Sequence, residues 1–277
     1  VDRRGEFGQF ILTGSSVPLH LSEGTHTGTG RIVRMRMRTM SLFESKDSSG
    51  EVSIGDLFHG KEVSAINHHS IEDIAFYICR GGWPIALNRS EKVALTQAFD
   101  YVDAVVNDDI SRVDDFQNVP ERTKRLLRSY ARNVATQASL ETLRMDVISN
   151  DVDTFDKETL YSYINALKRI FVIEDSPAWS PNLRSKTAIR TSDTRYFVDP
   201  SIATAALGLG PTDLIHDLAL MGLIFENLCI RDLRIYADAL NGNIYHYRDK
   251  TGLECDAVIH LRNGDYGLIE IKLGGDK

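Results

Sequence analysis

The fold of the C-terminal part is decided by the stretch Leu253-Glu-Cys-Asp-Ala-Val-Ile-His-Leu-Arg-Asn-Gly-Asp-Tyr-Gly-Leu-Ile-Glu-Ile-Lys-Leu273. Two strand-like runs, 253–261 and 266–273, are joined by Arg-Asn-Gly-Asp, and this pattern predicts a β-hairpin. Side chains alternate between the two faces of a strand, so Glu270 and Lys272 share one face of the second strand. The other face is expected to carry the apolar Ile269, Ile271 and Leu273.

The length of the turn decides where Asp256 of the first strand points. A two-residue turn pairs Asp256 with Ile271 and puts Asp256 on the face opposite Glu270. A three-residue loop over 263–265 with a bulge pairs Asp256 with Lys272, so that Asp256, Glu270 and Lys272 share one face. We predict the second arrangement.

A single acid interrupts the apolar face of a helix expected over residues 214–240. The residues three, four and seven positions from Glu226 are apolar or small, so its carboxylate would be taken out of water. A buried carboxylate is unfavourable unless it is paired or bound to a cation. We therefore expect Glu226 to face the acids of the hairpin.

These acids are oxygen donors of the kind that hard cations such as Mg²⁺ prefer. A lysine beside a metal-bound water could orient that water or assist its deprotonation for attack on a phosphodiester. The pattern thus predicts catalytic roles for Asp256, Glu270, Lys272 and Glu226, with metal ligation by Asp256 and Glu270. A structural ion pair of Lys272 with Glu270 or Asp256 is the alternative interpretation.

The composition sets outer limits on the class of protein. A chain of 277 residues with 42% hydrophobic residues can form two or three folded units, each with a core. Lys plus Arg is 32 and Asp plus Glu is 39, and the net charge of −7 excludes a generally polybasic protein that coats nucleic acid. The longest apolar run, 218–225, is too short to cross a bilayer.

The three cysteines, Cys79, Cys229 and Cys255, lack the spacing of a zinc site or a disulfide framework, which favours a reduced, cytoplasmic setting. The chain begins at Val1 rather than Met and enters a strand-like run almost at once. We therefore expect it to be a piece of a longer protein.

Two strands are expected near the N-terminus. Residues 10–13 followed by Gly-Ser-Ser predict a short buried strand that ends in a polar loop. In residues 31–38, arginines alternate with apolar residues, which predicts a strand with a cationic face. Arg34, Arg36 and Arg38 are either solvated or paired at a sheet edge, or they contact an anion such as phosphate.

A helix over 71–78 ends at Arg-Gly-Gly-Trp-Pro, where Gly and Pro stop it. Trp83 either stacks on a base or anchors the loop. Farther along, a long helix over 91–113 is followed by helices over 121–134 and 139–147, and Ser139 offers an N-cap for the last of these.

The best-formed helix begins after Asp156, which can cap it, and runs to about residue 169. A strand over 171–174, a polar loop over 180–187 and a second strand over 195–198 follow. This is the order of a winged helix-turn-helix. Lys157 and Lys168 would then lie on the recognition helix, and Arg184 and Lys186 at the wing tip, where they would contact nucleic-acid phosphates. Winged helices also bind proteins, and this alternative stays open.

Several segments together resemble a known family: residues 9–16, 30–31, 40–44, 80–84, 108–111 and 245–272, in this order. The chain resembles uncharacterised prokaryotic AAA-type P-loop ATPases that carry a C-terminal domain of unknown function, over nearly its whole length. The resemblance implies a multidomain α/β and α+β fold. Its parts would be 1–90, the end of the ATPase module with sensor strand and lid; 91–190, a winged-helix region; and 191–277, a truncated part resembling the PD-(D/E)XK restriction-endonuclease fold.

The resemblance also implies roles for individual residues. Thr13 and Ser15 match the end of the sensor-1 strand, Arg31 matches an arginine sensor or finger, and Gly82, Trp83 and Pro84 match the lid element near ATP. Asp256, Glu270 and Lys272 match the nuclease-like pattern, with Glu226 on the matching helix.

The chain departs from the family in having no GxxxxGK[ST] and no strand ending in Asp-Glu ahead of residue 13. The phosphate loop and Mg²⁺ ligands of an ATPase are therefore missing, and this chain alone should not hydrolyse ATP. The resemblance implies that the complete protein would bind ATP, with Mg²⁺ as a further candidate.

Three functions are compatible with these patterns. We favour an ATP-dependent switch that acts on DNA or on a protein partner. The alternatives are a Mg²⁺-dependent nuclease and an interaction scaffold without chemistry. A Walker A motif upstream of Val1 would favour the switch, and convergence of the carboxylates would favour the nuclease.

Overall fold

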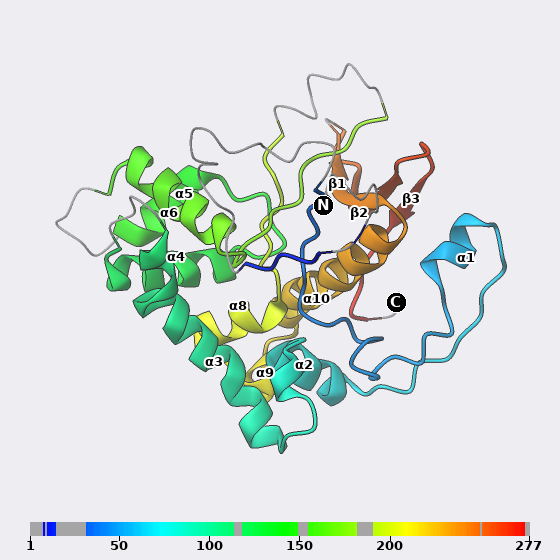
Figure 1. Cartoon of the computed structure of the whole chain (residues 1–277), viewed down its shortest axis with the longest axis horizontal. Helices are drawn as coiled ribbons and strands as arrows, with labels where there is room; N and C mark the ends of the chain where they lie inside the picture. The colour runs from blue at the N-terminus through cyan, green and yellow to red at the C-terminus, as the bar shows by residue number, and fades with distance from the viewer. Residues whose placement is uncertain are drawn as a thin grey trace.

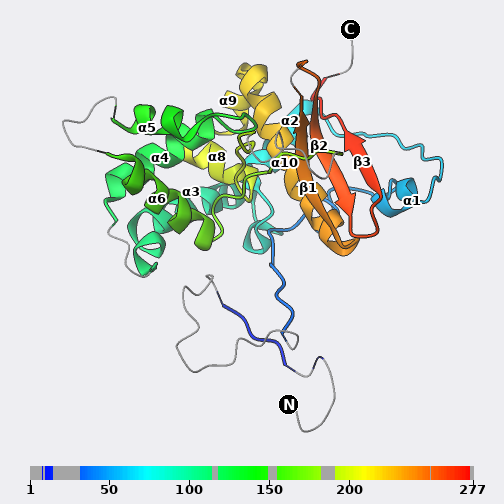
Figure 2. The same ribbon diagram turned by 90° about the horizontal axis from the view of Figure 1, so that it is seen from above.

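The computed structural model describes residues 8, 10–14, 32–113, 118–148, 155–181, 191–249 and 251–274. It has a mixed α/β fold in which helices form one end of the molecule and a small antiparallel sheet forms the other (Figure 1). The longest described helix, α10 (Leu218–Ala239), lies between the two parts, with the sheet on one side and α2, α8 and α9 on the other (Figure 2).

The helical elements are α1 (Ile54–Phe58), α2 (Ile71–Arg80), η1 (Pro84–Ala86), α3 (Glu91–Asn107), η2 (Asp109–Arg112), α4 (Pro120–Arg132), α5 (Leu140–Ile148), α6 (Lys157–Arg169), α8 (Pro200–Leu207), α9 (Pro211–His216) and α10. The strands are β1 (Gly242–Arg248), β2 (Glu254–Leu261) and β3 (Tyr266–Ile269), in the order β1-β2-β3.

Local capping explains where the helices begin. The side chain of Asp156 accepts a hydrogen bond from the Thr159 N–H at 2.7 Å, so the cap expected for α6 is confirmed. Ser139 bonds the Thr142 N–H at 3.1 Å at the start of α5, also as expected. The helix expected over 214–240 is instead two helices, because Asp217 ends α9 and its side chain caps α10.

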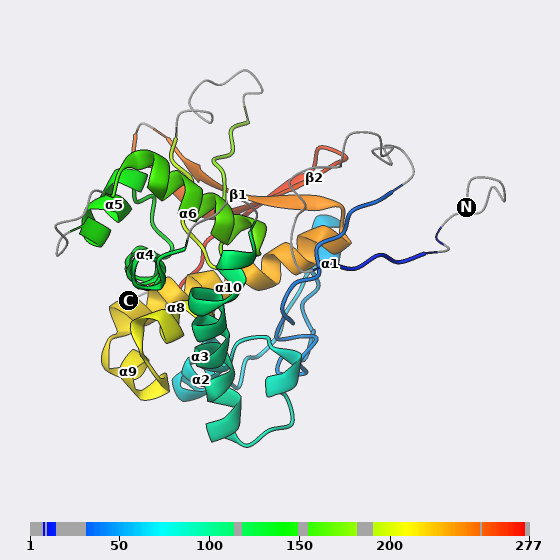
Figure 3. The same ribbon diagram turned by 60° about the vertical axis from the view of Figure 1, so that its left-hand side comes forward.

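Apolar residues on several faces of α10 are buried because the helix is covered from two sides. It contacts α2, α8 and α9 on one side and runs beneath β1 and β2 on the other (Figure 3). Met221, Ile224 and Leu228 are among its fully buried side chains. A charged group on such a helix must find its partner inside the protein.

The hairpin is confirmed, but its expected register is wrong. The ladder pairs Ala257 with Ile269 and His260 with Tyr266, and the Leu261 N–H bonds the Asp265 carbonyl at 2.8 Å. Continuing this register by one residue sets Asp256 opposite Glu270 and not opposite Lys272. The partner of Asp256 is therefore two residues earlier in the sequence than expected. The strands pair as far as Leu261 and Asp265, so the loop covers residues 262–264 and not the expected 263–265.

The two strands expected near the N-terminus are wrong within the described residues. Residues 10–14 and 32–38 are extended but unpaired, and Ile11 and Met37 are 90% and 96% exposed. A strand needs a neighbour to bond its backbone, and no described strand lies against either segment. Ser15 and Arg31 lie outside the described residues.

The segments around 173 and 195 pair as expected, yet only as isolated bridges between Ile173 and Phe197 and between Ser176 and Thr194. The two strands expected there are therefore reduced to bridges. Phe171 has a φ of 57°, which breaks the extended backbone directly before this pairing. The tip of the expected wing, with Arg184 and Lys186, lies outside the described residues.

Candidate functional site

Glu226 of α10 lies in an acidic environment beneath the sheet. The Tyr196 hydroxyl donates a hydrogen bond to its Oε1. Burial raises the pKa of Glu226 to about 7, although the Tyr196 hydrogen bond lowers it. The negative charges of Asp256 and Glu270 raise the pKa of Glu226 further. Glu226 is thus accommodated in the protein by the hydrogen bond from Tyr196 and, near neutral pH, by binding a proton.

Asp256 lies at an irregularity of the sheet, where the β1–β2 register shifts between Tyr245 and Tyr247. Its Oδ2 accepts a hydrogen bond from the Ile271 N–H at 2.7 Å, just beyond the end of β3. The carboxylate thus takes the place of a ladder carbonyl. Burial raises the pKa of Asp256, the Ile271 hydrogen bond lowers it, and the Glu270 charge raises it.

Glu270 and Lys272 form an ion pair at 3.5 Å, with side chains that are 55% and 58% exposed. This contact is the structural alternative that the sequence left open. Within the residues that the structure describes, no three His, Cys, Asp or Glu side chains are grouped so as to hold a metal ion. The acids expected to act together do lie within electrostatic range, and their arrangement favours holding a proton.

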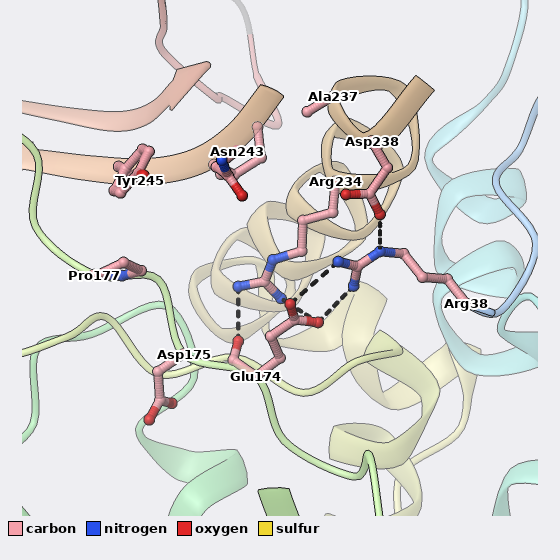
Figure 4. A pocket seen from close by; sticks show the side chains of 10 residues that line it. Arg38, Glu174, Asp175, Pro177, Arg234, Ala237, Asp238, Asn243 and Tyr245 are labelled. Atoms are coloured by element: carbon pink, nitrogen blue, oxygen red, sulfur yellow. Dashed lines mark hydrogen bonds and ion pairs between the residues drawn. The ribbon is translucent and has the colours of Figure 1, made fainter. Parts of the chain in front are cut away.

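A second cluster surrounds Glu174 and involves two of the arginines expected to form a cationic strand face, of which Figure 4 shows Arg38. Arg38 Nη1 and Nη2 lie 2.5 and 3.2 Å from the two Glu174 oxygens, and Arg36 Nη1 lies 2.7 Å from Oε2. Arg38 Nε also bonds Asp238 of α10 at 2.8 Å. Of the two interpretations of these arginines, the structure places Arg36 and Arg38 in ion pairs.

Arg234 of α10 completes the cluster from inside the protein. Its Nη2 donates to the Glu174 carbonyl at 2.7 Å and to the Ser176 hydroxyl at 2.9 Å. Burial raises the pKa of Glu174, but Arg234, Arg38 and Arg36 outweigh this effect and hold the pKa at about 2. A pocket of about 170 Å³ lies beside the cluster, lined by Arg38, Glu174, Asp175, Pro177, Arg234, Ala237, Asp238, Asn243, Ile244 and Tyr245.

Sequence reasoning missed Glu174 and Arg234. Arg234 interrupts the apolar α10 in the same way as Glu226, so the same test of helical neighbours could have found it. Nothing in the sequence marks Glu174 as its partner, because the two residues are far apart in the chain and meet only through the packing of α10.

The expected lid element is held by internal contacts. The Gly82 N–H bonds Asp199 at 2.9 Å, and the Gly82 carbonyl accepts from the Met40 N–H at 2.7 Å. Trp83 donates to the Ser201 hydroxyl at 2.9 Å and packs on Tyr101, with 4.5 Å between ring centroids.

In this structure Trp83 anchors the loop, the second of the two roles considered for it. Pro84 begins η1. Thr13 lies in the exposed N-terminal segment, away from these residues.

A buried ion-pair network joins this loop to α10. Arg231, whose side chain is 1% exposed, lies 3.2 Å from Asp199 and 2.8 Å from Asp232. Asp232 in turn accepts a hydrogen bond from the Leu42 N–H at 2.9 Å. The backbone around residues 40–42 is therefore bonded both to the Gly82 loop and to α10.

The lysines of the expected recognition helix are engaged on the protein surface. Lys168 binds Asp175 at 2.9 Å, and Lys157 lies 3.9 Å from Glu141. Asp175 also binds Arg195 at 2.8 Å, which ties α6 to the segment after the wing.

Comparison with known families gives two matches. The model of a domain of unknown function, DUF8612, matches residues 71–213, which is more than half of the chain. The chain belongs to the DUF8612 family. A second domain of unknown function, DUF4143, which is often associated with AAA-type ATPases, matches residues 221–277. No curated protein and no solved structure matches the chain. Among the described residues of this DUF8612 protein, no helix has the length and apolarity needed to span a membrane.

The Glu174 cluster lies at the junction of the two matched regions. Glu174 belongs to the DUF8612 region, and Arg234 and Asp238 belong to the DUF4143 region. Arg36 and Arg38 come from the segment that precedes both. Three parts of the DUF8612 protein therefore meet at one carboxylate.

Proposed function

We propose that this DUF8612-family chain is the C-terminal part of an AAA-type ATP-binding protein and works as an ATP-dependent switch that acts on a protein partner. The observation that carries the proposal is the double contact of Arg38, which binds Glu174 and Asp238 at the same time. One side chain of the N-terminal segment thereby holds both matched regions.

The position of this segment connects the contact to ATP. Residues 36–42 closely follow Arg31, which the family resemblance assigns as an arginine sensor or finger. The association of DUF4143 with AAA-type ATPases also supports a link to ATP. A shift of Arg31 that depends on bound ATP and Mg²⁺ would pull on Arg38, and through it on α10.

The buried network of Arg231 makes a stepwise response reasonable. Breaking one partner of a buried pair leaves an uncompensated charge, so intermediate positions are unfavourable. The Leu42–Asp232 hydrogen bond attaches this network to the same N-terminal segment. We therefore expect a pull on the segment to move the protein between two distinct arrangements of the network, without gradual deformation.

A protein partner is favoured over DNA by the charges of α6. Lys168 binds the buried Asp175, Lys157 is largely exposed, and the net charge of the chain is −7. Nucleic-acid affinity depends mainly on cations that are available to phosphates. DNA contact would then depend on Lys157, Arg184 and Lys186. Replacement of all three by Gln should leave partner binding unchanged if the partner is a protein.

The decisive experiment is hydrogen exchange of the complete natural protein with and without a non-hydrolysable ATP analogue and Mg²⁺. We expect the analogue to bind and to change amide protection in residues 36–42 and in the second half of α10. Arg38→Met should abolish the change in α10. Arg34→Met, in the same segment but without an ion pair to any described residue, should retain it. Absence of ATP binding, or a response confined to residues before 32, would refute the switch.

A Mg²⁺-dependent nuclease is the second candidate, because Glu226, Asp256 and Glu270 lie within electrostatic range of one another. It ranks second because Asp256 already bonds the Ile271 N–H. Calorimetric titration with Mg²⁺ tests it. Binding that is lost in Glu226→Gln and in Asp256→Asn, together with cleavage of a DNA substrate, would move this candidate to first place.

A further inference from the structure

Three guanidinium groups approach the single carboxylate of Glu174, and they do not share it equally. Arg38 bonds both oxygens, and Arg36 lies 2.7 Å from Oε2. Arg234 Nη1 lies 3.9 Å from the same Oε2, which is beyond hydrogen-bond distance. Arg234 is thus an ion-pair partner of the carboxylate without a hydrogen bond to it, while Arg38 and Arg36 hold the short contacts.

Arg234 is left with an unused donor in a buried position. Its side chain is 5% exposed, and Nη1 has no hydrogen-bond partner among the described residues. Burial lowers the pKa of Arg234, the charge of Glu174 raises it, and the charge of Arg38 lowers it. Arg38 and Arg234 thus compete for one anion. A buried charged donor without a partner is unfavourable, so Arg234 gains whenever Glu174 becomes free.

The surroundings allow Arg234 to reach Glu174 with little rearrangement. Its Nη2 already bonds the Glu174 carbonyl, so the two residues are held together before the carboxylate turns. The pocket of about 170 Å³ lies along Arg38, Glu174 and Arg234 and provides space for side-chain rotation (Figure 4).

We propose that Glu174 exchanges partners, passing from Arg36 and Arg38 to Arg234 when the segment 32–38 is withdrawn. The exchange frees Asp238 from Arg38 and binds the DUF8612 region more tightly to α10 through Arg234. Glu174 keeps a cationic partner in both arrangements, so its carboxylate is never left buried without a counter-ion. A modest pull on the segment can therefore change the populations of the two arrangements. Only the trigger rests on the proposed function, because the exchange itself needs nothing but removal of the two arginines.

The exchange is tested on this 277-residue chain by NMR of its ¹⁵N-labelled arginine side chains. In Arg36→Met/Arg38→Met we expect the Arg234 Nη protons to exchange with water at least tenfold more slowly, with shifted resonances. Arg34→Met is the matched control and should leave Arg234 as in the wild type. Unchanged Arg234 signals in the double variant would overturn the proposal.

A second measurement guards against a double variant that folds poorly. Arg38→Gln alone removes the bidentate contact and leaves Arg36 in place, and it should give a smaller shift of the same Arg234 resonances. Adding Glu174→Gln to Arg38→Gln should reverse the shift, because the acceptor is then lost. If Glu174→Gln has no influence on Arg234 in that background, Arg234 has not taken the carboxylate and the exchange is refuted.

A third measurement, made with an ATP analogue, distinguishes the partner exchange of Glu174 from the ATP-dependent switch. In the complete natural protein, an ATP analogue with Mg²⁺ should shift the Arg234 resonances in the same direction as the double variant. A response to the variants without a response to the analogue supports the exchange and refutes ATP as its trigger. A response of amide protection to the analogue with unchanged Arg234 signals refutes the exchange and leaves the switch standing.

Discussion

Glu174 packs against α10 and Glu226 belongs to it, and the pKa values of the two glutamates are shifted in opposite directions. Burial raises the pKa of each. Guanidinium groups then hold the pKa of Glu174 at about 2, whereas the carboxylates of Asp256 and Glu270 help to raise that of Glu226 to about 7. Because burial raises both pKa values, the comparison shows that the sign of the neighbouring charges decides whether the pKa of a buried acid ends below or above its ordinary value.

The difference assigns different tasks to the two regions. A glutamate that stays charged at every physiological pH can hold cationic segments together, as Glu174 does for Arg38 and Arg234. A glutamate with a pKa near 7 binds or releases a proton with little free energy. Four substitutions or conditions can break or sharpen this contrast.

Replacing Glu174 by Gln should have the largest effect. The amide removes the carboxylate that Arg36, Arg38 and Arg234 share, although Arg38 keeps its contact with Asp238. Loss of one partner of a buried ion pair typically costs about 3 kcal/mol or more. We expect Glu174→Gln to lower the free energy of unfolding by about 3 kcal/mol, measured by urea denaturation at pH 7. The control is Glu141→Gln, which removes an exposed carboxylate from Arg144. An equal response of the two variants would mean that the arginines do not depend on Glu174.

Acid should weaken the fold through the same residue. The pKa of Glu174 in the folded chain, about 2, lies below its ordinary value of 4.5, so the unfolded chain binds more protons between these values. The stabilisation is present above pH 4.5 and should be lost as the pH falls toward 2, by roughly 2 to 3 kcal/mol. Urea denaturation of the wild type and of Glu174→Gln across this range checks it. Parallel curves would contradict the lowered pKa.

Glu226 should show the opposite sign. Its folded pKa of about 7 lies above the ordinary 4.5, so the folded chain binds more protons between pH 4.5 and 7, and stability falls as the pH rises through this window. Glu226→Gln removes the charge and should stabilise the chain by about 1.5 kcal/mol at pH 8, with little effect at pH 4. Thermal unfolding in EDTA measures both. A variant that is less stable at pH 8 only when Mg²⁺ is present would reveal a cation partner.

Asp256 should have the smallest effect on stability. Asn at this position can still accept from the Ile271 N–H, so we expect a change of only about 0.5 kcal/mol. The negative charge beside Glu226 disappears, and the pKa of Glu226 should fall. A ¹³C NMR titration of the glutamate side-chain carboxyl groups checks this shift. An unchanged Glu226 titration would place the two carboxylates too far apart to form one cluster.

Local patterns were sufficient to predict most helices and the hairpin. Asp156 and Ser139 could be recognised as caps because a cap acts within one helical turn. The register of β2 and β3 could not be predicted, because it depends on how far the strands pair before the turn. The sheet irregularity beside Asp256 belongs to its pairing with β1, a strand that sequence alternation around the turn does not reveal.

Long-range electrostatics could be predicted only in part. The helical neighbours of Glu226 indicated that its carboxylate needs a partner, but they could not distinguish a cation from the Tyr196 hydroxyl. The alternating arginines were noticed, but an extended segment whose arginines pair with Glu174 has the same periodicity as a strand in a sheet. The spacing of residues in the sequence indicates which side chains share a face of a helix or strand. Which other part of the chain covers that face depends on tertiary packing.

The contact between Gly82 and Met40 has a consequence for which substitutions each position accepts. A Cβ placed on Gly82 would lie 2.1 Å from the Met40 carbonyl oxygen, a distance that no side chain can adopt. The contact at residue 40 is made by its backbone, whose N–H bonds the Gly82 carbonyl, so its side chain is not part of it. In a library of all single substitutions, position 82 should accept only glycine, while position 40 accepts side chains of many sizes.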